Sequence, residues 1–141
     1  MSPILDRFRH LLLRQEVHIG NLSASDLGLI IVAAGLAIPK ELSSSEKEVT
    51  ERLDQWLATV GTNIQADAVE MRRYLVDYRC LERDPAGKVY TRPSAWPTRW
   101  QELAAELAPF DLASFAAQVR LEEIERRAAR KAEVLRKRDE R

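Results

Sequence analysis

Five side chains in the middle of the chain have the chemistry of a nucleic-acid contact. Guanidinium and ammonium groups bind the phosphate oxygens of a backbone, and a tyrosine ring packs on a sugar or on the methyl group of thymine. Four phosphate contacts would give binding to duplex DNA a logarithmic salt slope of roughly −3.6, at ~0.9 per phosphate. The predicted nucleic-acid-binding residues are Arg73, Tyr74, Arg83, Lys88 and Arg92.

Acidic neighbours give the same region a second interpretation. On a 3.6-residue helical wheel, Glu70 and Asp77 share the outward face with Arg73 and Tyr74. Asp77 follows Arg73 by four residues, a spacing at which the two side chains can pair. In this alternative the face is a solvated helix surface with a local ion pair.

Two further arginines fall on the inward arc of the same wheel, Arg72 and Arg79. An arginine in that position more often pairs with a carboxylate inside the fold than reads a base. For Arg72 we expect a structural ion pair, with Glu48 or Asp54 as the partner.

A capped helix and a tight hairpin must position these side chains. Asp67 can accept a hydrogen bond from the free amides of a first helical turn, with Glu70 completing a capping box. The run Asp84-Pro85-Ala86-Gly87 favours a type I turn followed by a left-handed glycine. Segments 81–83 and 88–92 are predicted to pair as strands. Together these features predict a recognition helix and a wing.

Three helices and a short strand are predicted before this unit. The helices are expected at residues 4–15, from Ser23 to near Gly35, and from Ser45, which forms a capping box with Glu48. Residues 37–39 should be extended, because a residue before proline avoids the helical region. This succession predicts a mainly α fold with a small β-hairpin: a winged helix-turn-helix with an N-terminal helix and a long helical C-terminal extension.

The segments EKEVTERL at 46–53 and DAVEMRRYLVDYRCLERDPAGKVYTR at 67–92 resemble a family known only as domain of unknown function 2087. Members of that family sometimes follow ArsR-type winged-helix heads, so the resemblance implies a transcription-linked role with binding to nucleic acid. The chain departs from the family pattern at Thr50, where the family carries Asn, and at Arg79, where it carries Gly. A left-handed Gly position costs other residues about 1 kcal/mol, so Arg79 predicts a strained cap or a different helix end.

The chain changes character after residue 92, which suggests three parts. These are a winged-helix-like domain at 1–92, a Pro- and Trp-rich connector with a short helix at 93–111, and a charged C-terminal helix at 112–141. Trp96 and Trp100 should anchor the connector on the domain. The alternative function, from a different class, is a non-catalytic protein-interaction or dimerisation module that uses the Trp connector and the C-terminal helix.

Two features of the C-terminal helix bear on that alternative. Leu121, Ile124, Ala128 and Leu135 form a heptad-like seam, interrupted by Lys131, through which a homodimer or another protein could associate. The second feature is a basic block, which begins after Ile124 and contains seven positive residues between 126 and 138. This block is either a solvated surface with local pairing or a contact for nucleic acid or an acidic partner.

Composition and residue usage exclude several classes of function. The 22 basic residues balance the 22 acidic ones, so long-range attraction cannot carry DNA binding. His10 and His18 are isolated from the single cysteine, Cys80, and no Gly-rich phosphate loop is present, so we expect no enzyme, no cofactor and no metal site. A lone cysteine fits the reducing cytoplasm. The apolar run Leu27–Ile38 is too short to span a membrane.

Overall fold

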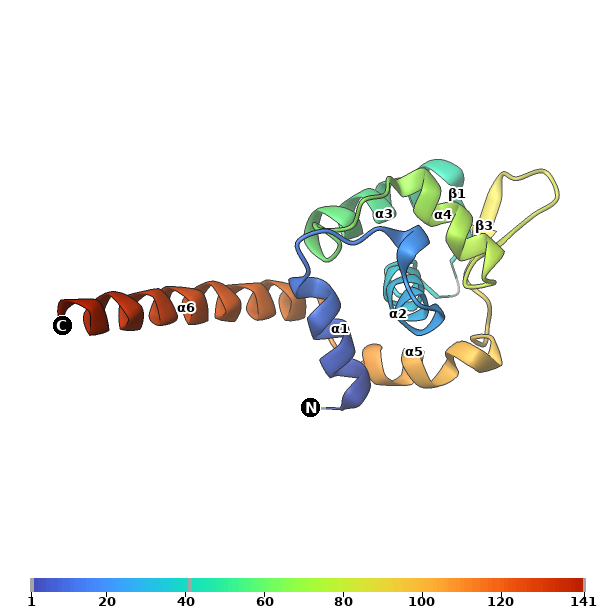
Figure 1. Ribbon diagram of the computed structural model, residues 1–141. Coiled ribbons are helices and arrows are strands. Elements are labelled where there is room, and N and C mark those ends of the chain that lie inside the picture. Colours follow the sequence, from blue (N-terminus) through green and yellow to red (C-terminus); the bar gives the residue numbers. More distant parts are fainter. Residues whose placement is uncertain (1, 41, 141) are drawn as a thin grey trace.

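The computed structural model describes residues 2–40 and 42–140, which fold into helices and three short strands (Figure 1). The elements in chain order are α1 (Pro3–Leu13), η1 (Ile19–Asn21), α2 (Ala24–Gly35), β1 (Ser44–Ser45), α3 (Glu46–Thr59), α4 (Ala68–Asp77), β2 (Glu82–Arg83), β3 (Val89–Thr91), η2 (Thr98–Trp100), α5 (Gln101–Leu107) and α6 (Leu112–Asp139).

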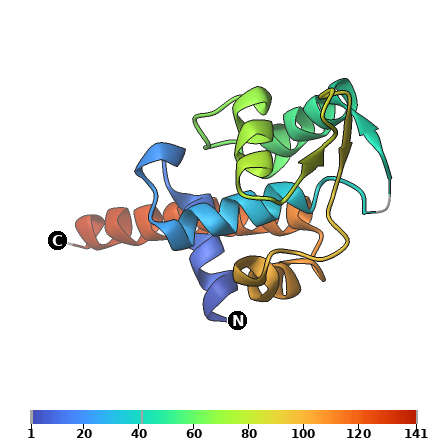
Figure 2. The same ribbon diagram turned by 90° about the vertical axis from the view of Figure 1, so that its right-hand side faces the viewer.

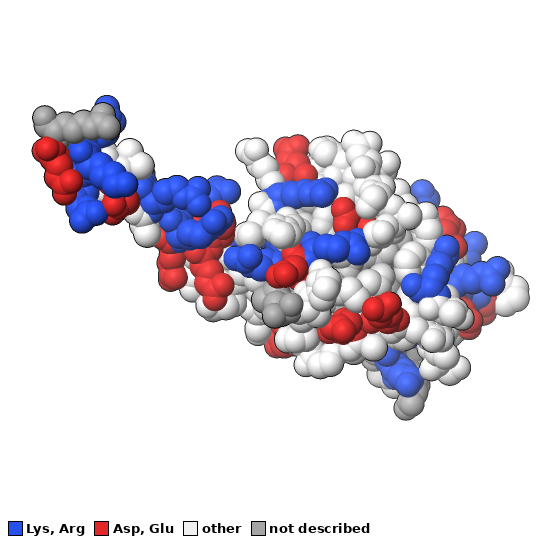
Figure 3. Space-filling model, turned by 60° about the horizontal axis from the view of Figure 1, so that its bottom comes forward, with Lys and Arg blue, Asp and Glu red and all other residues white. Residues whose placement is uncertain are grey.

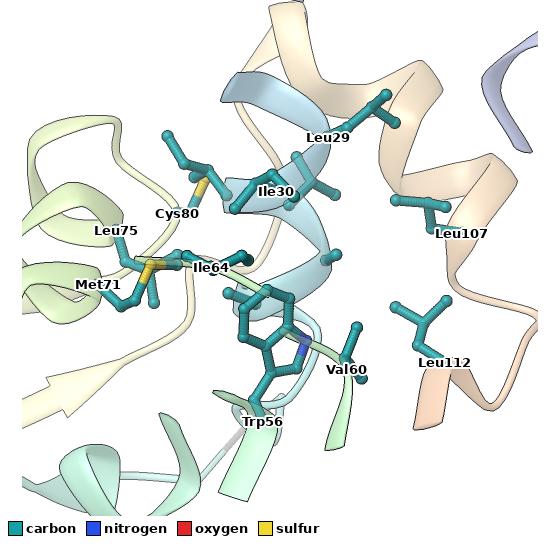
Figure 4. Close-up of a cluster of buried hydrophobic side chains, with 14 of the residues drawn as sticks. Leu29, Ile30, Trp56, Val60, Ile64, Met71, Leu75, Cys80, Leu107 and Leu112 are labelled. Atoms are coloured by element: carbon teal, nitrogen blue, oxygen red, sulfur yellow. The ribbon is translucent and has the colours of Figure 1, made fainter. Parts of the chain in front are cut away.

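Helix α2 forms the centre of the fold, because every residue from Gly28 to Gly35 is apolar and buried. It lies between a layer of α3, α4 and the strands and a second layer of α1 and α5 (Figures 1 and 2). The close-up in Figure 4 shows side chains of α4 meeting α2 from one side and Leu107 and Leu112 meeting it from the other. The Ser23 hydroxyl caps α2 by accepting from the Asp26 amide, as the sequence predicts.

The central elements follow in the order β1, α3, α4, β2, β3, and the predicted class, mainly α with a small β-hairpin, is confirmed. The strands form an antiparallel sheet in the order β1-β3-β2, with Tyr90 paired to Ser44 on one side and Arg83 on the other. The prediction of an extended segment at 37–39 as the first strand is wrong. Ala37 and Ile38 donate to carbonyls of α2, so the chain continues in turns, and the strand forms directly before α3 instead.

Trp100 anchors the connector in the core, as predicted. Its side chain is buried, its indole Nε1 donates to the Tyr78 carbonyl oxygen at 3.2 Å, and its ring packs on Gly28 of α2. A Cβ at Gly28 would lie 2.5 Å from a Trp100 ring carbon, so this contact requires glycine. The hydrophobic core therefore continues across residues 92 and 111, the boundaries suggested by composition, and includes Leu107, Leu112 and Val119.

Arg120 fastens α6 to the ends of two other helices. Its guanidinium donates to the carbonyl oxygens of Leu12 at the end of α1 and of Thr59 and Val60 at the end of α3. It also donates to Asn63 Oδ1, while Asn63 Nδ2 donates to the Leu11 and Arg14 carbonyls. Burial lowers the pKa of Arg120. These bonds satisfy carbonyls that two helix ends leave without helical partners.

Beyond Arg120, α6 leaves the globular part and projects away from it on the side opposite the β2–β3 hairpin (Figure 1). At 1.5 Å per residue the projecting part is about 28 Å long. The Asp111 carboxylate caps the start of α6 by accepting from the Ser114 amide. Among the described residues, no helix is both long enough and apolar enough to cross a membrane.

Candidate nucleic-acid interface

Helix α4 is specified at its start by Asp67 and held by its apolar face. Asp67 Oδ1 accepts from the Glu70 amide at 2.8 Å, which confirms the predicted N-cap. Met71 and Leu75 are fully buried against the rest of the core. This orientation leaves Arg73 exposed on the opposite face.

Arg79 ends α4 in the left-handed conformation, with φ of 62°. The Cys80 amide donates to the Leu75 carbonyl across this residue at 2.8 Å, the pattern of a Schellman cap. Of the two sequence-based alternatives, the strained cap is the one that the structure contains. Arg79 itself is exposed and lies outside the helix, so its predicted inward position is wrong, because the helix ends before it.

Replacing Arg79 with glycine is expected to raise the free energy of unfolding by about 1 kcal/mol, because glycine adopts this backbone conformation without a Cβ clash. Urea unfolding followed by circular dichroism measures the change. Arg79→Ala is the matched control, since it removes the same charge but retains a Cβ. Equal stability of the two variants would contradict the backbone explanation.

The side chain of Asp84 stabilises the turn of the hairpin. Asp84 Oδ1 accepts from the amides of Lys88 at 2.7 Å and Val89 at 3.0 Å, and these bonds lower the pKa of Asp84. The Gly87 amide donates to the Asp84 carbonyl, and Gly87 has φ of 70°. The predicted turn with a left-handed glycine is therefore confirmed, and it presents the exposed side chains of Arg83 and Lys88 on a defined ribbon.

A hollow of about 260 Å³ separates α4 from the hairpin. Three of its six lining side chains are arginines, and one is a carboxylate. The lining residues are Arg72, Arg73, Val76, Asp77, Arg83 and Tyr90. The fold thus brings Arg73 of α4 and Arg83 of the β2–β3 hairpin to one concave surface, which their ten-residue separation in sequence does not show.

Arg72 holds the wall of this hollow through internal contacts. Its Nη1 donates to Thr50 Oγ1 at 2.9 Å, its Nη2 lies 3.2 Å from a Glu46 carboxylate oxygen, and its guanidinium lies over the Tyr90 ring. The structural role expected for Arg72 is confirmed, but the predicted partner is wrong. Glu48 is engaged instead in the Ser45 capping box, and Glu46, two residues closer to the helix start, reaches Arg72.

Arg73, Arg83 and Lys88 keep their cationic groups available. In residues 2–40 and 42–140, none of the ion pairs within 4.0 Å includes any of the three. The pairing of Arg73 with Asp77 that the sequence allows is therefore absent from the described residues. All three side chains belong to exposed residues.

The structure does not bring Arg92 to this surface. Its Nη1 donates to the Ile38 carbonyl at 3.1 Å, its guanidinium stacks over Trp96 at 5.3 Å, and burial lowers its pKa. The chain turns inward after β3, so Arg92 lies at the end of α2 and does not extend the surface of the hairpin. Sequence position beside the hairpin gives no indication of that turn.

Tyr74 is half-buried rather than free to pack on a nucleotide. Its ring stacks on Tyr78 with centroids 6.3 Å apart, and Tyr78 in turn contacts Trp100. The ring face that stacks on Tyr78 is therefore not available to a ligand. Cys80, close by in sequence, is buried, and burial raises the pKa of its thiol to about 12, so it is a protonated thiol at neutral pH.

The basic block of α6 is partly paired within the helix. Arg126 and Arg127 both contact Glu123, and Arg136 and Lys137 both contact Glu133. Figure 3 shows Lys and Arg side chains along the projecting helix with acidic side chains beside them. This arrangement matches the solvated-surface interpretation for these four residues.

Comparison with known proteins identifies the central segment. Residues 31–92 match the family described as "Uncharacterized protein conserved in bacteria (DUF2087)". This segment contains the C-terminal end of α2, all of β1, α3 and α4, and the hairpin. No curated protein and no solved structure matches the chain.

Proposed function

We propose that residues 31–92, the segment that matches the DUF2087 family, bind double-stranded DNA through α4 and the β2–β3 hairpin in a transcription-associated role. The observation that carries the proposal is the shared hollow between helix and wing, lined by Arg73 and Arg83. A DNA backbone that enters it meets cations from both elements. Such a role places the chain in the cytoplasm, in keeping with its single, buried cysteine.

The contacts of this interface are three cations rather than the four expected from sequence. Arg73, Arg83 and Lys88 are exposed and unpaired with described carboxylates, whereas Arg92 is engaged inside the fold. Asp77 in the same hollow opposes phosphate entry on its side. Because the chain carries no net charge, binding depends on close contacts and not on long-range attraction. The expected salt slope is then about −2.7.

The test is fluorescence anisotropy with a mixed-sequence duplex between about 50 and 200 mM salt, over which the intact chain should lose about 40-fold in affinity. Arg73→Ala/Arg83→Ala/Lys88→Ala should lose this salt-dependent binding. Arg130→Ala/Lys131→Ala/Arg138→Ala is the matched control, because it removes three positive charges from the projecting helix.

Two results would contradict the proposal. The first is the absence of salt-sensitive binding by the intact chain at the lowest salt concentration. The second is that the α6 variant loses binding while the Arg73/Arg83/Lys88 variant retains it, which would place the contact on the basic block of α6. Circular dichroism of both variants checks that each remains folded.

A second function, association through α6, is favoured by the apolar side chains of the projecting part. Ile124 is 65% exposed and Leu135 is 49% exposed, on a helix face with no partner among the described residues. Trp96 and Trp100 do not contribute to such a surface, because both pack on α2. Light scattering of the intact chain and of the variant Ile124→Glu/Leu135→Glu tests this association by measuring the mass of each. A dimer that the substitutions dissociate supports association through α6, and a monomeric intact chain excludes a homodimer.

A further inference from the structure

A cavity of about 490 Å³ lies on the far side of α3 from the hairpin hollow, and the two share no residue. It is bounded by the end of α2, by one face of α3 and by the turn between α5 and α6. Its volume falls within the range of sites that bind small molecules. Short side chains leave the space open, since Ala33, Ala37, Ala108 and Ala113 all line it.

The walls of the cavity are mainly apolar, with two uncharged polar residues, Gln55 and Thr59, and with charged residues that are all positive among those described. Trp56, Val60, Phe110 and Leu112 supply the apolar part, and Figure 4 shows Trp56 and Val60 facing Leu112 across the region. Arg52 and Arg92 are the charged residues that line it, and none of the described lining residues carries a carboxylate. A mixed surface of this kind complements a molecule with an apolar body and one anionic end.

Both arginines retain hydrogen-bonding capacity. Arg52 forms no ion pair within the described part of the chain. Arg92 uses Nη1 for the Ile38 carbonyl, while a guanidinium has five N–H donors. Burial lowers the pKa of Arg92, and an anion in the cavity would offset that loss of solvation.

Trp56 provides an independent observation at the same wall. Its residue is 4% exposed, and its indole Nε1 is the buried side-chain polar atom in the described residues that has no hydrogen-bond partner. A buried N–H without an acceptor is unfavourable, and such groups in a native fold are uncommon. This atom exposes less than 1 Å² to solvent, so an oxygen of a molecule seated against this wall would reach it only after a shift of the Trp56 side chain or its neighbours.

We propose that this cavity binds a small carboxylic acid with an aromatic or aliphatic body, with the carboxylate at Arg52 and Arg92 and the body against Trp56 and Leu112. The site is separate from the DNA contact, so either proposal can fail without the other. The carboxylate forms charge-assisted hydrogen bonds to the two guanidinium groups. The apolar body removes surface from water.

The experiment is an NMR titration of the intact, ¹⁵N-labelled chain with 4-phenylbutyrate, in which the indole N–H signals of Trp56 and Trp100 are followed. The Trp56 signal should shift saturably, and the Trp100 signal, already bonded to Tyr78, should shift less. The uncharged analogue 4-phenylbutanamide should bind about tenfold more weakly, because it lacks the charge-assisted bonds. Acetate, which has no apolar body, should not produce a saturable shift.

Two pairs of variants locate the binding site. Arg52→Gln should weaken binding of the acid about tenfold and leave the amide unchanged, whereas Lys47→Gln, on the same helix but outside the cavity, should change neither. Ala113→Leu should fill the cavity and abolish both, whereas Ala117→Leu, one turn along α6, should leave both intact. Both alanines are exposed, so the fold tolerates the larger side chain.

Three results would overturn the proposal. Equal affinity for the acid and the amide would show that the arginines take no part. Unchanged binding by Ala113→Leu would place the acid elsewhere on the molecule. The absence of any saturable shift at the Trp56 indole would show that the cavity does not accept this class of compound.

Discussion

Replacing Arg120 with methionine is expected to lower the free energy of unfolding by about 3 kcal/mol, because it removes charged hydrogen bonds to three backbone carbonyls and to Asn63. The carbonyls belong to the ends of α1 and α3, so the substitution releases α6 from both helices at once. Small domains are stable by only about 5–15 kcal/mol, so the loss is large. Chemical denaturation followed by circular dichroism measures it.

Two further variants separate this role from a general effect of charge. Arg126→Met removes an exposed arginine of the same helix that contacts only Glu123, and should change stability by less than about 1 kcal/mol. Arg120→Lys should recover little, because one ammonium group cannot match the planar set of donors that reaches both helix ends. An Arg120→Met chain that unfolds at the same denaturant concentration as the parent would refute the proposed anchor.

Replacing Trp100 with alanine is expected to destabilise the fold by about 3–4 kcal/mol, the usual range for removing a buried aromatic side chain. The ring is 7% exposed, fills the space that Gly28 leaves, and contacts Tyr78 at the end of α4. Its loss would therefore loosen the connector from α2 and also leave the Tyr78 carbonyl without its indole donor. Thermal and chemical unfolding give the change.

Trp100→Phe is the graded control for that prediction. It retains most of the apolar contact and loses only the hydrogen bond and part of the volume, so an intermediate loss of about 1–2 kcal/mol is expected. Trp100→Ala with parental stability would mean that the connector does not anchor on α2, and it would return the two tryptophans to the set of surfaces available for docking.

Local hydrogen-bond chemistry allowed several elements to be predicted from the sequence. The caps at Ser23, Ser45, Asp67 and Asp111 join a side chain to an amide three residues later, so both partners lie within one short segment. The hairpin turn is equally local, since Asp84 bonds amides four and five residues on. With the apolar spacing of the helices, these signals were sufficient for the succession of elements and the fold class.

The candidate site was only partly predictable, because it depends on contacts between distant segments as well as on local ones. Arg73, Arg83 and Lys88 were identified from their positions on a predicted helix and hairpin, and the structure leaves all three exposed. Whether an arginine is exposed depends on what else approaches it, however. Arg92 meets the carbonyl of Ile38, 54 residues away in sequence, and no pattern near Arg92 encodes that meeting.

The sequence by itself determined where helices, caps and the turn form, because those choices are made between residues a few positions apart. Only the tertiary structure decided which charged groups remain free. Arg120 donates to the carbonyl of Leu12, 108 residues away in sequence. The sequence indicates this anchoring role only by placing a charged residue directly after Val119, which is buried. Three other features also form where distant segments meet: the ion pair of Arg72 with Glu46, the inward position of Arg92 and the cavity beside Trp56. Helical or strand periodicity contains no information about contacts between distant segments.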